Sequence, residues 1–277
     1  MNINSYAKIN LSLKVNSKQK SSLHEIQTYF CLIDLADKIK INKTKGVKDK
    51  IIFKGKFARS INKRNNSIIN LLNILRRLKL ISSYYSIKVI KNIPVFGGLG
   101  GGTSNAAFIL KYLLKKRLNK NLLNELKSKI GSDIVLFFKK QGFMKNLKLI
   151  IGLKKKNFHF VLIQPKIRCS TKDIYSRVKK FSRKERLDKK IANSKNRFLT
   201  YLSTNKNDLQ FVVERKHPFI KKLLADIKKE KGCHFSRMTG SGSVCYGLFN
   251  HKIIAKKALK KLKKKYPKLW FSLAKTV

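Results

Sequence analysis

The chain has 277 residues, with 66 Lys and Arg against 13 Asp and Glu, so its formal net charge is +53. Hydrophobic residues make up 43% of the chain, which is enough for a sizeable core and excludes wholesale disorder. No apolar run approaches the roughly 18 residues that span a bilayer, and the N-terminus lacks the basic start and apolar stretch of a signal peptide. We therefore expect a cytoplasmic protein with one large or two moderate domains and no membrane partner.

The excess of positive charge has two interpretations. Lys and Arg neutralise phosphates, which favours a nucleic-acid-binding protein. The basic residues are spread along the whole chain, however, and Lys, Ile and Asn dominate throughout, as in proteins from AT-rich genomes. Aromatic residues are not interleaved with them as a stacking platform requires. Compositional drift is the favoured interpretation, so no specific nucleic acid is expected, although such a surface attracts polyanions in either case.

The cysteine pattern argues against a metal site. Cys31, Cys169, Cys233 and Cys245 lie far apart, and the chain has no CxxC pair and no histidine at finger-like spacing. We predict buried thiols and no zinc site.

The elements predicted up to residue 114 begin with a strand. Residues 5–15 alternate polar and apolar side chains from Lys8 onward, which indicates a half-buried strand. Asn65, Asn66 and Ser67 precede an apolar face at helical spacing, which indicates a capped helix. The other segments are predicted strands at 26–32, 38–41 and 86–90, a glycine loop at 94–104 and a helix at 106–114.

Helices and strands remain mixed to the C-terminus. The predicted helices are 121–130, 208–214, 217–229 and 251–265, and the predicted strands are 147–152, 158–164, 235–238, 244–249 and 269–275. Residues 134–138 form a short apolar segment, and the very basic stretch 176–197 is predicted to be a solvated helix or loop. Because the chain has no internal repeat, this mixture indicates an α/β or α+β fold. A boundary near 140–155 gives two predicted domains, 1–150 and 151–277.

The loop at 94–104 is the glycine cluster of this chain. It consists of Pro94, Val95, Phe96, Gly97, Gly98, Leu99, Gly100, Gly101, Gly102, Thr103 and Ser104. Glycines leave backbone N–H groups unshielded, and the N-terminus of the following helix adds free N–H groups and positive partial charge. A tight turn needs only one or two glycines, so five favour a phosphate-binding loop. The loop is neither a Walker A motif, since no GK[ST] ends it, nor a dinucleotide fingerprint.

Other candidate residues have both a functional and a structural interpretation. Asp133 lies before an apolar run, and its carboxylate can accept a proton from a hydroxyl. By itself, however, it is interpreted as a turn or cap residue. Lys8 lies in an apolar strand, and by itself it is interpreted as a strand residue that faces solvent. The loop 239–243 is either a hairpin turn or a second wall of a nucleotide pocket. His24 is unclustered, which favours a structural histidine.

Together these motifs resemble the GHMP kinase superfamily. The matching segments are 6–11, 91–107, 131–133 and 238–242, which come in the order and at the separations of that family. The resemblance covers nearly the whole chain and is weakest at 177–215. It implies a two-domain α/β kinase, with an ATP-binding N-terminal domain, a C-terminal GHMP domain and the active site in the cleft between them.

Within that superfamily, the Ala-Lys-Ile-Asn-Leu start and the Gly-Leu-Gly-Gly-Gly loop resemble the branch that acts in the non-mevalonate isoprenoid pathway. The resemblance implies transfer of the γ-phosphoryl group of ATP to the 2-hydroxyl of 4-diphosphocytidyl-2-C-methyl-D-erythritol. The implied partner is therefore a small molecule, a cytidine diphosphate sugar alcohol. A monomer or a homodimer is expected.

The resemblance also implies roles for the matched positions. Asp133 is the implied base, and Lys8 is the cation that keeps it ionised and stabilises developing charge. Residues 94–104 cradle the phosphates of ATP, with Mg²⁺ bridging them, and no side chain is predicted as a metal ligand. Asn66, Ser67 and Lys91 match positions of the adenosine pocket. The implied substrate contacts are Asn10, His24, Asn105, Thr171, Tyr175, Thr239 and Gly240, with His24 near the cytosine and Tyr175 stacked on it.

Two departures from the family pattern bear on ligand binding. The tyrosine that usually precedes the histidine is Leu23 here, so apolar contact replaces stacking. Phe96 occupies a loop position that is usually Gly or Ala, and it either packs under the loop or narrows the adenine site. The open alternatives are a GHMP kinase for another small alcohol such as homoserine or mevalonate, a basic nucleic-acid-binding protein, and a degenerate kinase retained for its interactions.

Overall fold

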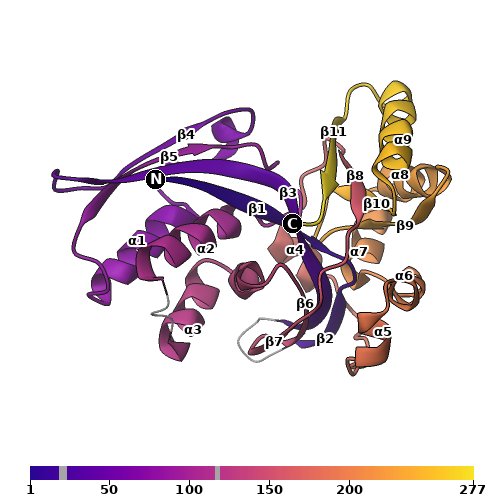
Figure 1. Cartoon of the computed structure of the whole chain (residues 1–277), viewed down its shortest axis with the longest axis horizontal. Coiled ribbons are helices and arrows are strands. Elements are labelled where there is room, and N and C mark those ends of the chain that lie inside the picture. Colours follow the sequence, from indigo (N-terminus) through magenta and orange to yellow (C-terminus); the bar gives the residue numbers. More distant parts are fainter. Residues whose placement is uncertain (19–23, 116–118) are drawn as a thin grey trace. The chain divides into compact units, whose positions relative to one another are not determined.

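The computed structural model describes residues 1–18, 24–115 and 119–277, which form two compact units (Figure 1). The first unit comprises Met1–Lys8, Leu35–Val95 and Gly100–Phe138, and the second comprises Ile9–Asp34, Phe96–Leu99 and Lys139–Val277. Both units are discontinuous in sequence, whereas the predicted domains are contiguous, and the division at 150/151 stays a prediction.

In the first unit, helices cover one face of a β-sheet (Figure 1). Strand β4 (Lys50–Lys54) pairs in parallel with β5 (Tyr84–Ile90), and β5 pairs antiparallel with the end of β3 (His24–Thr44). Strand β1 (Asn2–Asn10) also pairs with β3. The helical elements are η1 (Ala58–Ser60), α1 (Ser67–Arg77), α2 (Gly101–Leu114), α3 (Lys120–Lys129) and the 3₁₀ helix η2 (Ser132–Phe138).

Helix α1 begins where the sequence predicts it. The side chain of Asn66 accepts hydrogen bonds from the backbone N–H groups of Ile68 at 3.1 Å and Ile69 at 3.2 Å. This cap satisfies two donors that the first turn of a helix leaves without partners. The apolar face that follows, including Leu71 and Leu75, is buried, so capping and periodicity together define the element.

Strand β3 is one strand of 21 residues where the sequence predicted two shorter ones. Asp34 and Asp37 lie between the two predicted strands. In the structure, Asp34 accepts a hydrogen bond from the backbone N–H of Lys275 at 2.8 Å, and Asp37 accepts from those of residues 92 and 93 at 2.8 and 2.9 Å. These partners satisfy both carboxylates, so the strand continues through them.

The strand predicted over 5–15 is wrong in two respects. Strand β1 ends at Asn10, and the chain resumes extended structure only at Lys14, the first residue of β2 (Lys14–Lys18). The stretch is also not half-buried, because all side chains from Ala7 to Leu13 are buried. The polar side chains in this stretch are therefore inside the protein.

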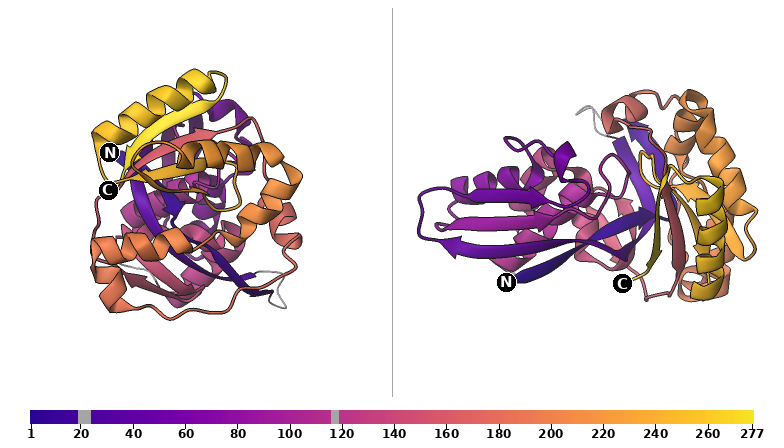
Figure 2. Two further views of the ribbon diagram at one scale, coloured as in Figure 1. Left: turned by 90° about the vertical axis from the view of Figure 1, so that its right-hand side faces the viewer. Right: turned by 90° about the horizontal axis from the view of Figure 1, so that it is seen from above.

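The second unit contains strands of two sheets (Figure 2). Strand β2, the first half of β3, β6 (Gln141–Asn146) and β7 (Leu149–Gly152) pair antiparallel in one. The other has the order β11 (Trp270–Lys275), β8 (His159–Gln164), β10 (Cys245–Phe249) and β9 (Cys233–Met238). Helices α8 (Pro218–Lys228) and α9 (Lys252–Lys265) pack on one face of this second sheet. The remaining helices are α4 (Thr171–Ser176), α5 (Lys189–Asn193), α6 (Lys195–Thr204) and α7 (Asp208–Lys216).

The observed elements confirm a mixed α/β fold. Strands β4 and β6 and helices α4 and α6 were not predicted, and residues 177–188 form neither helix nor strand. All four cysteines are free and buried, as predicted. Over the described ranges, no helix combines the length and the apolar character needed to cross a membrane.

Candidate active site

Lys8 and Asp133 form an ion pair in the first unit. The Nζ of Lys8 lies 3.1 Å from the Oδ2 of Asp133, and their side chains are 2% and 32% exposed, respectively. The solvent-facing interpretation of Lys8 is therefore wrong. Asp133 lies in the first turn of η2, after Gly131, which has a φ of 141°. The pair places a buried cation against a carboxylate that solvent or a ligand can still reach.

The N-terminus of α2 lies beside this pair. The helix begins at Gly101, five residues before its predicted start at 106, and its N-cap residue Gly100 has a φ of 70°. A Cβ added at Gly100 would lie 2.9 Å from Cζ of Phe137 and 3.4 Å from Cε of Lys8. A cap without a side chain leaves the N–H groups of the first turn open to an anion. Free N–H groups, the positive helix end and the Lys8 ammonium thus converge on one place.

The first turn of α2 also approaches the segment that carries Asp133. The Oγ1 of Thr103 lies 3.5 Å from the position of a Cβ added at Gly131. Ser104 is buried, and its Oγ lies 2.7 Å from that of Ser5. Ser104 therefore fixes α2 on β1, while Thr103 lies on the side of η2.

Lys91 and Asn105 lie in a buried polar network at the base of α2. Lys91 forms an ion pair with Asp37, and both are at most 2% exposed. The amide of Asn105 accepts a hydrogen bond from Lys91 Nζ at 3.1 Å and donates to Asp37 at 2.9 Å. Burial lowers the pKa of Lys91, and the carboxylate of Asp37 opposes that shift. In this structure, Lys91 and Asn105 hold the loop in place, and their predicted ligand contacts stay predictions.

Asn66 and Ser67 lie at the start of α1, and Ser67 faces the glycine loop. A Cβ added at Gly102 would lie 3.1 Å from the Oγ of Ser67. Gly102 itself is exposed. The first unit thus brings Ser67, one of the three predicted adenosine-pocket residues, to the exposed part of the glycine loop. Pro94 and Val95 lead into this loop from the first unit.

In the second unit, the middle of the glycine loop pairs with the loop between β9 and β10. The carbonyls of Phe96 and Gly97 accept hydrogen bonds from the backbone N–H groups of Ser243 at 3.1 Å and Val244 at 3.3 Å. A Cβ added at Gly98 would lie 2.0 Å from the carbonyl oxygen of Thr239. Only glycine fits such a close approach at a positive φ. The loop 239–243 is therefore more than a hairpin turn.

Thr239 connects this contact to Asn10. Its Oγ1 accepts a hydrogen bond from the backbone N–H of Asn10 at 3.0 Å and lies 3.4 Å from the carbonyl oxygen of Gly98. The side chain of Asn10 donates to Thr28 Oγ1 at 2.9 Å. Because Thr239 and Asn10 are both buried, they position backbone in this structure, and their predicted substrate contacts stay predictions.

His24 and Tyr175, the residues predicted to contact cytosine, come together in the second unit. Their ring centroids lie 5.0 Å apart with an interplanar angle of 38°. Burial and, to a smaller extent, Lys18 lower the pKa of His24, which favours a neutral imidazole. The prediction about Leu23 falls outside the described residues.

The remaining predicted residues lie near the loop 239–243. Thr171, the first residue of α4, has its Oγ1 2.9 Å from the Oγ of Ser241. Gly240 has a φ of 55°. Phe96 is 48% exposed, with the guanidinium of Arg168 5.5 Å from its ring centroid. Packing of Phe96 under the loop is therefore wrong, because its ring faces solvent.

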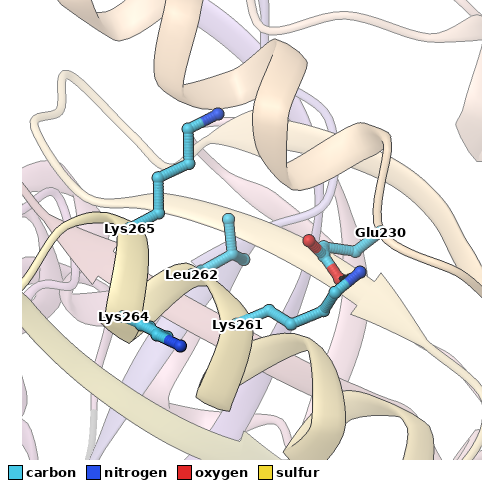
Figure 3. A pocket seen from close by; sticks show the side chains of 5 residues that line it. All are labelled: Glu230, Lys261, Leu262, Lys264 and Lys265. Carbon is cyan, nitrogen blue, oxygen red and sulfur yellow. Dashed lines mark ion pairs between the residues drawn. The ribbon is translucent and has the colours of Figure 1, made fainter.

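No group of three or more His, Cys, Asp or Glu side chains suited to a metal ion occurs in the part of the chain that the structure describes. Figure 3 shows a pocket of about 330 Å³ in the second unit, lined by Glu230, Lys261, Leu262, Lys264 and Lys265. Lys261 and Glu230 form an ion pair there at 3.8 Å. The pocket contains none of the predicted site residues.

Asp37 and Arg237 were missed in the sequence. Arg237 is 4% exposed, and its guanidinium donates to the carbonyls of Leu11 and Leu202, the latter at 2.9 Å. Tyr246 donates to the carbonyl of Asn10 at 3.0 Å. These bonds hold the chain at the end of β1.

The sequence contained a signal for Asp37, since it is one of only 13 acidic residues and lies among apolar strand residues. Arg237 had none, because it is one of 66 basic residues.

Comparison with known proteins agrees with these motifs. The family model for the GHMP kinase N-terminal domain matches residues 66–141, and the model for the C-terminal domain matches residues 189–268. The 4-diphosphocytidyl-2-C-methyl-D-erythritol kinase of Pelagibacter ubique is 38% identical, over 99% of this chain and 98% of the relative. The enzyme of the same name from Wolbachia pipientis wMel is 30% identical, over 95% of this chain and 94% of the relative.

Solved structures show the same fold. A crystal structure of 4-(cytidine 5'-diphospho)-2C-methyl-D-erythritol kinase superposes with a TM-score of 0.74 at 23% identity and covers 99% of both chains. A homoserine kinase from Cytophaga hutchinsonii superposes with a TM-score of 0.72 at 14% identity, over 100% of this chain and 94% of the other. The fold alone does not separate these two activities, whereas the sequence relatives do. The chain belongs to the GHMP kinases, in the family of 4-diphosphocytidyl-2-C-methyl-D-erythritol kinases.

Proposed function

We propose that this chain phosphorylates the 2-hydroxyl of 4-diphosphocytidyl-2-C-methyl-D-erythritol with ATP as donor. The observation that carries the proposal is the Lys8–Asp133 ion pair at 3.1 Å beside Gly100, the N-cap of α2. The names of the relatives supply the substrate, and their identity of up to 38% over 99% of the chain supports carrying it over.

In the proposed reaction, Asp133 accepts the proton of the substrate hydroxyl as the oxygen attacks the γ-phosphorus of ATP. The bond from that phosphorus to the β,γ-bridging oxygen breaks, which releases ADP and the phosphorylated alcohol. The buried Lys8 ammonium, 3.1 Å from the Asp133 carboxylate, offsets charge on the transferred group. The first-turn N–H groups of α2 bind phosphate oxygens, so positioning and electrostatics do most of the work.

Mg²⁺ enters this proposal as the counter-ion of the nucleotide. It would reduce repulsion between the attacking oxygen and the phosphates. In the second unit, the rings of His24 and Tyr175 are the groups we assign to the cytidine of the substrate.

The test is a coupled ADP-release assay with MgATP and this substrate, with homoserine and mevalonate assayed in parallel. We expect turnover with the cytidine substrate alone, and Asp133→Asn should lower kcat by about 10²–10⁴-fold, since it removes a positioned base. Asp226→Asn is a matched control, because Asp226 also pairs with a lysine, Lys265, at 2.8 Å. Turnover of homoserine or mevalonate instead would retain the family and reject the substrate. Near wild-type turnover by Asp133→Asn would reject the mechanism.

A further inference from the structure

Phe181 is an exposed aromatic residue of the second unit to which the proposed reaction assigns no part. Its side chain is 46% exposed. Its ring centroid lies 6.5 Å from that of His24, at an interplanar angle of 40°. The ring centroid of Tyr175 also lies 5.0 Å from that of His24, so Phe181 adds a third ring to this pair. A single exposed phenylalanine is ordinary, but Phe181 lies beside the partly exposed ring of His24, which itself adjoins the ring of Tyr175. Such a row of rings offers a surface for a planar ligand.

The backbone next to Phe181 is held firmly. Ser182 donates its backbone N–H to the carbonyl of Val15 at 2.8 Å and its hydroxyl to Asp208 Oδ2 at 2.7 Å. Its carbonyl accepts a hydrogen bond from the side chain of Asn16 at 3.0 Å. Three polar groups of the residue that follows Phe181 are therefore satisfied by β2 and the start of α7. The Phe181 ring is exposed although its backbone is fixed, and not because the segment is loose.

Further along, the same segment is tied to β3. Glu185 and Gln27 exchange two hydrogen bonds, at 2.8 Å and 3.0 Å. Lys184 forms an ion pair at 2.9 Å with Glu25, the neighbour of His24 in the chain. The chain has only 13 acidic residues, yet the carboxylates of Glu25, Asp208 and Glu185, the last paired with Lys14, all anchor this segment. The anchoring keeps Phe181 at a set distance from His24.

We propose that Phe181 binds the pyrimidine base of the substrate through its ring face, next to His24 and Tyr175. This inference rests on the proposed function, which supplies a ligand with a cytidine diphosphate group. Aromatic rings stack on planar bases whatever hydrogen-bonding edge the base presents. Phe181 therefore adds affinity for the base without selecting between pyrimidines. Because it has no part in proton or phosphoryl transfer, it affects the KM of the cytidine substrate and leaves kcat and the KM of ATP unchanged.

The test compares three variants with the wild-type enzyme. Phe181→Leu removes the ring and keeps an apolar side chain, and Phe181→Tyr keeps the ring. Phe211→Leu is the matched control, since Phe211 is 65% exposed in α7 with a guanidinium, that of Arg215, 5.8 Å from its centroid. We expect Phe181→Leu to raise the KM of the cytidine substrate about 5–10-fold, while the other two variants stay within about twofold of wild type.

Calorimetric titration with CDP and with UDP, without ATP, gives a second readout. Phe181→Leu should weaken the binding of both nucleotides by the same factor. An unchanged KM in Phe181→Leu, an equal rise in Phe211→Leu, or weakening of CDP alone would overturn the proposal. If the wild-type enzyme does not turn over the cytidine substrate, the proposed function fails by itself. The titrations then still decide the role of Phe181, and absence of CDP binding to the wild type overturns that role too.

Discussion

Replacement of Gly100 by alanine tests whether the start of α2 and the Lys8–Asp133 pair form one site. Gly100 has a φ of 70°, where a side chain costs about 1–2 kcal/mol. The added Cβ would lie 2.9 Å from Cζ of Phe137, so the ring must also shift. The reduced freedom of the unfolded chain returns about 0.4–1 kcal/mol. With about 1 kcal/mol for the shift of the Phe137 ring, we expect Gly100→Ala to lower the free energy of unfolding by about 1–2.6 kcal/mol.

The same substitution should also lower activity. The same Cβ would lie 3.4 Å from both Cε and Cγ of Lys8, so Lys8 must adjust if the neighbouring backbone shifts. Since misplacement by about 1 Å can cost about 10²-fold in rate, kcat should fall at least about tenfold. The assays are thermal unfolding by circular dichroism, where each kcal/mol shifts the midpoint by roughly 2–4 °C, and ADP release at saturating substrate.

Gly46→Ala is the matched control for this substitution. A Cβ at Gly46 would meet only the Oγ1 of Thr44, at 3.5 Å, and its φ is not positive. We expect this variant to unfold within about 0.5 kcal/mol of wild type and to keep full activity. The reasoning is refuted if Gly100→Ala matches Gly46→Ala in both midpoint and kcat.

Two further predictions concern buried charge and pH. Lys91→Met leaves the buried carboxylate of Asp37 without its cation and should cost about 3–5 kcal/mol in urea unfolding; adding Asp37→Asn should recover part of this loss, and no recovery would contradict a direct charge interaction. For His24, burial holds the folded pKa below the ordinary value of 6.5, so the unfolded chain binds more protons between that pKa and 6.5. The His24 contribution to stability is therefore complete above pH 6.5 and is lost as the pH falls through the folded pKa. An NMR titration giving His24 a pKa at or above 6.5 would contradict this.

Some features of the site are local and could be read from the sequence. Asn66 caps α1 because its side chain accepts from N–H groups two and three residues ahead, which is a relation within one turn. The five glycines indicated a loop for phosphate because glycine alone tolerates a positive φ without cost. Both relations depend on neighbours in the chain, so the sequence contains all the information they need.

The length of β3 and the start of α2 could not be predicted from the sequence. Asp34 finds its partner 241 residues away, at Lys275, and no local pattern reports such a bond. The glycines at 101 and 102 suggested a loop, yet they begin the helix. A Cβ at Gly101 would lie 3.0 Å from Ile93 Cγ2. Glycine therefore allows the helix to pack closely against Ile93, although glycine has a low helix propensity.

The sequence by itself determined the family, the glycine loop and the hypothesis that Asp133 and Lys8 act together in catalysis. Each of these follows from the order and spacing of short motifs, which can be read before the fold is known. Only the tertiary structure decided that Lys8 is 2% exposed and lies 3.1 Å from Asp133. It also decided that Lys91 lies in a buried network with Asp37 and that Phe181 lies beside His24. Burial depends on what packs against the far side of a strand, and in a chain with 66 basic residues composition does not tell a buried lysine from a solvated one.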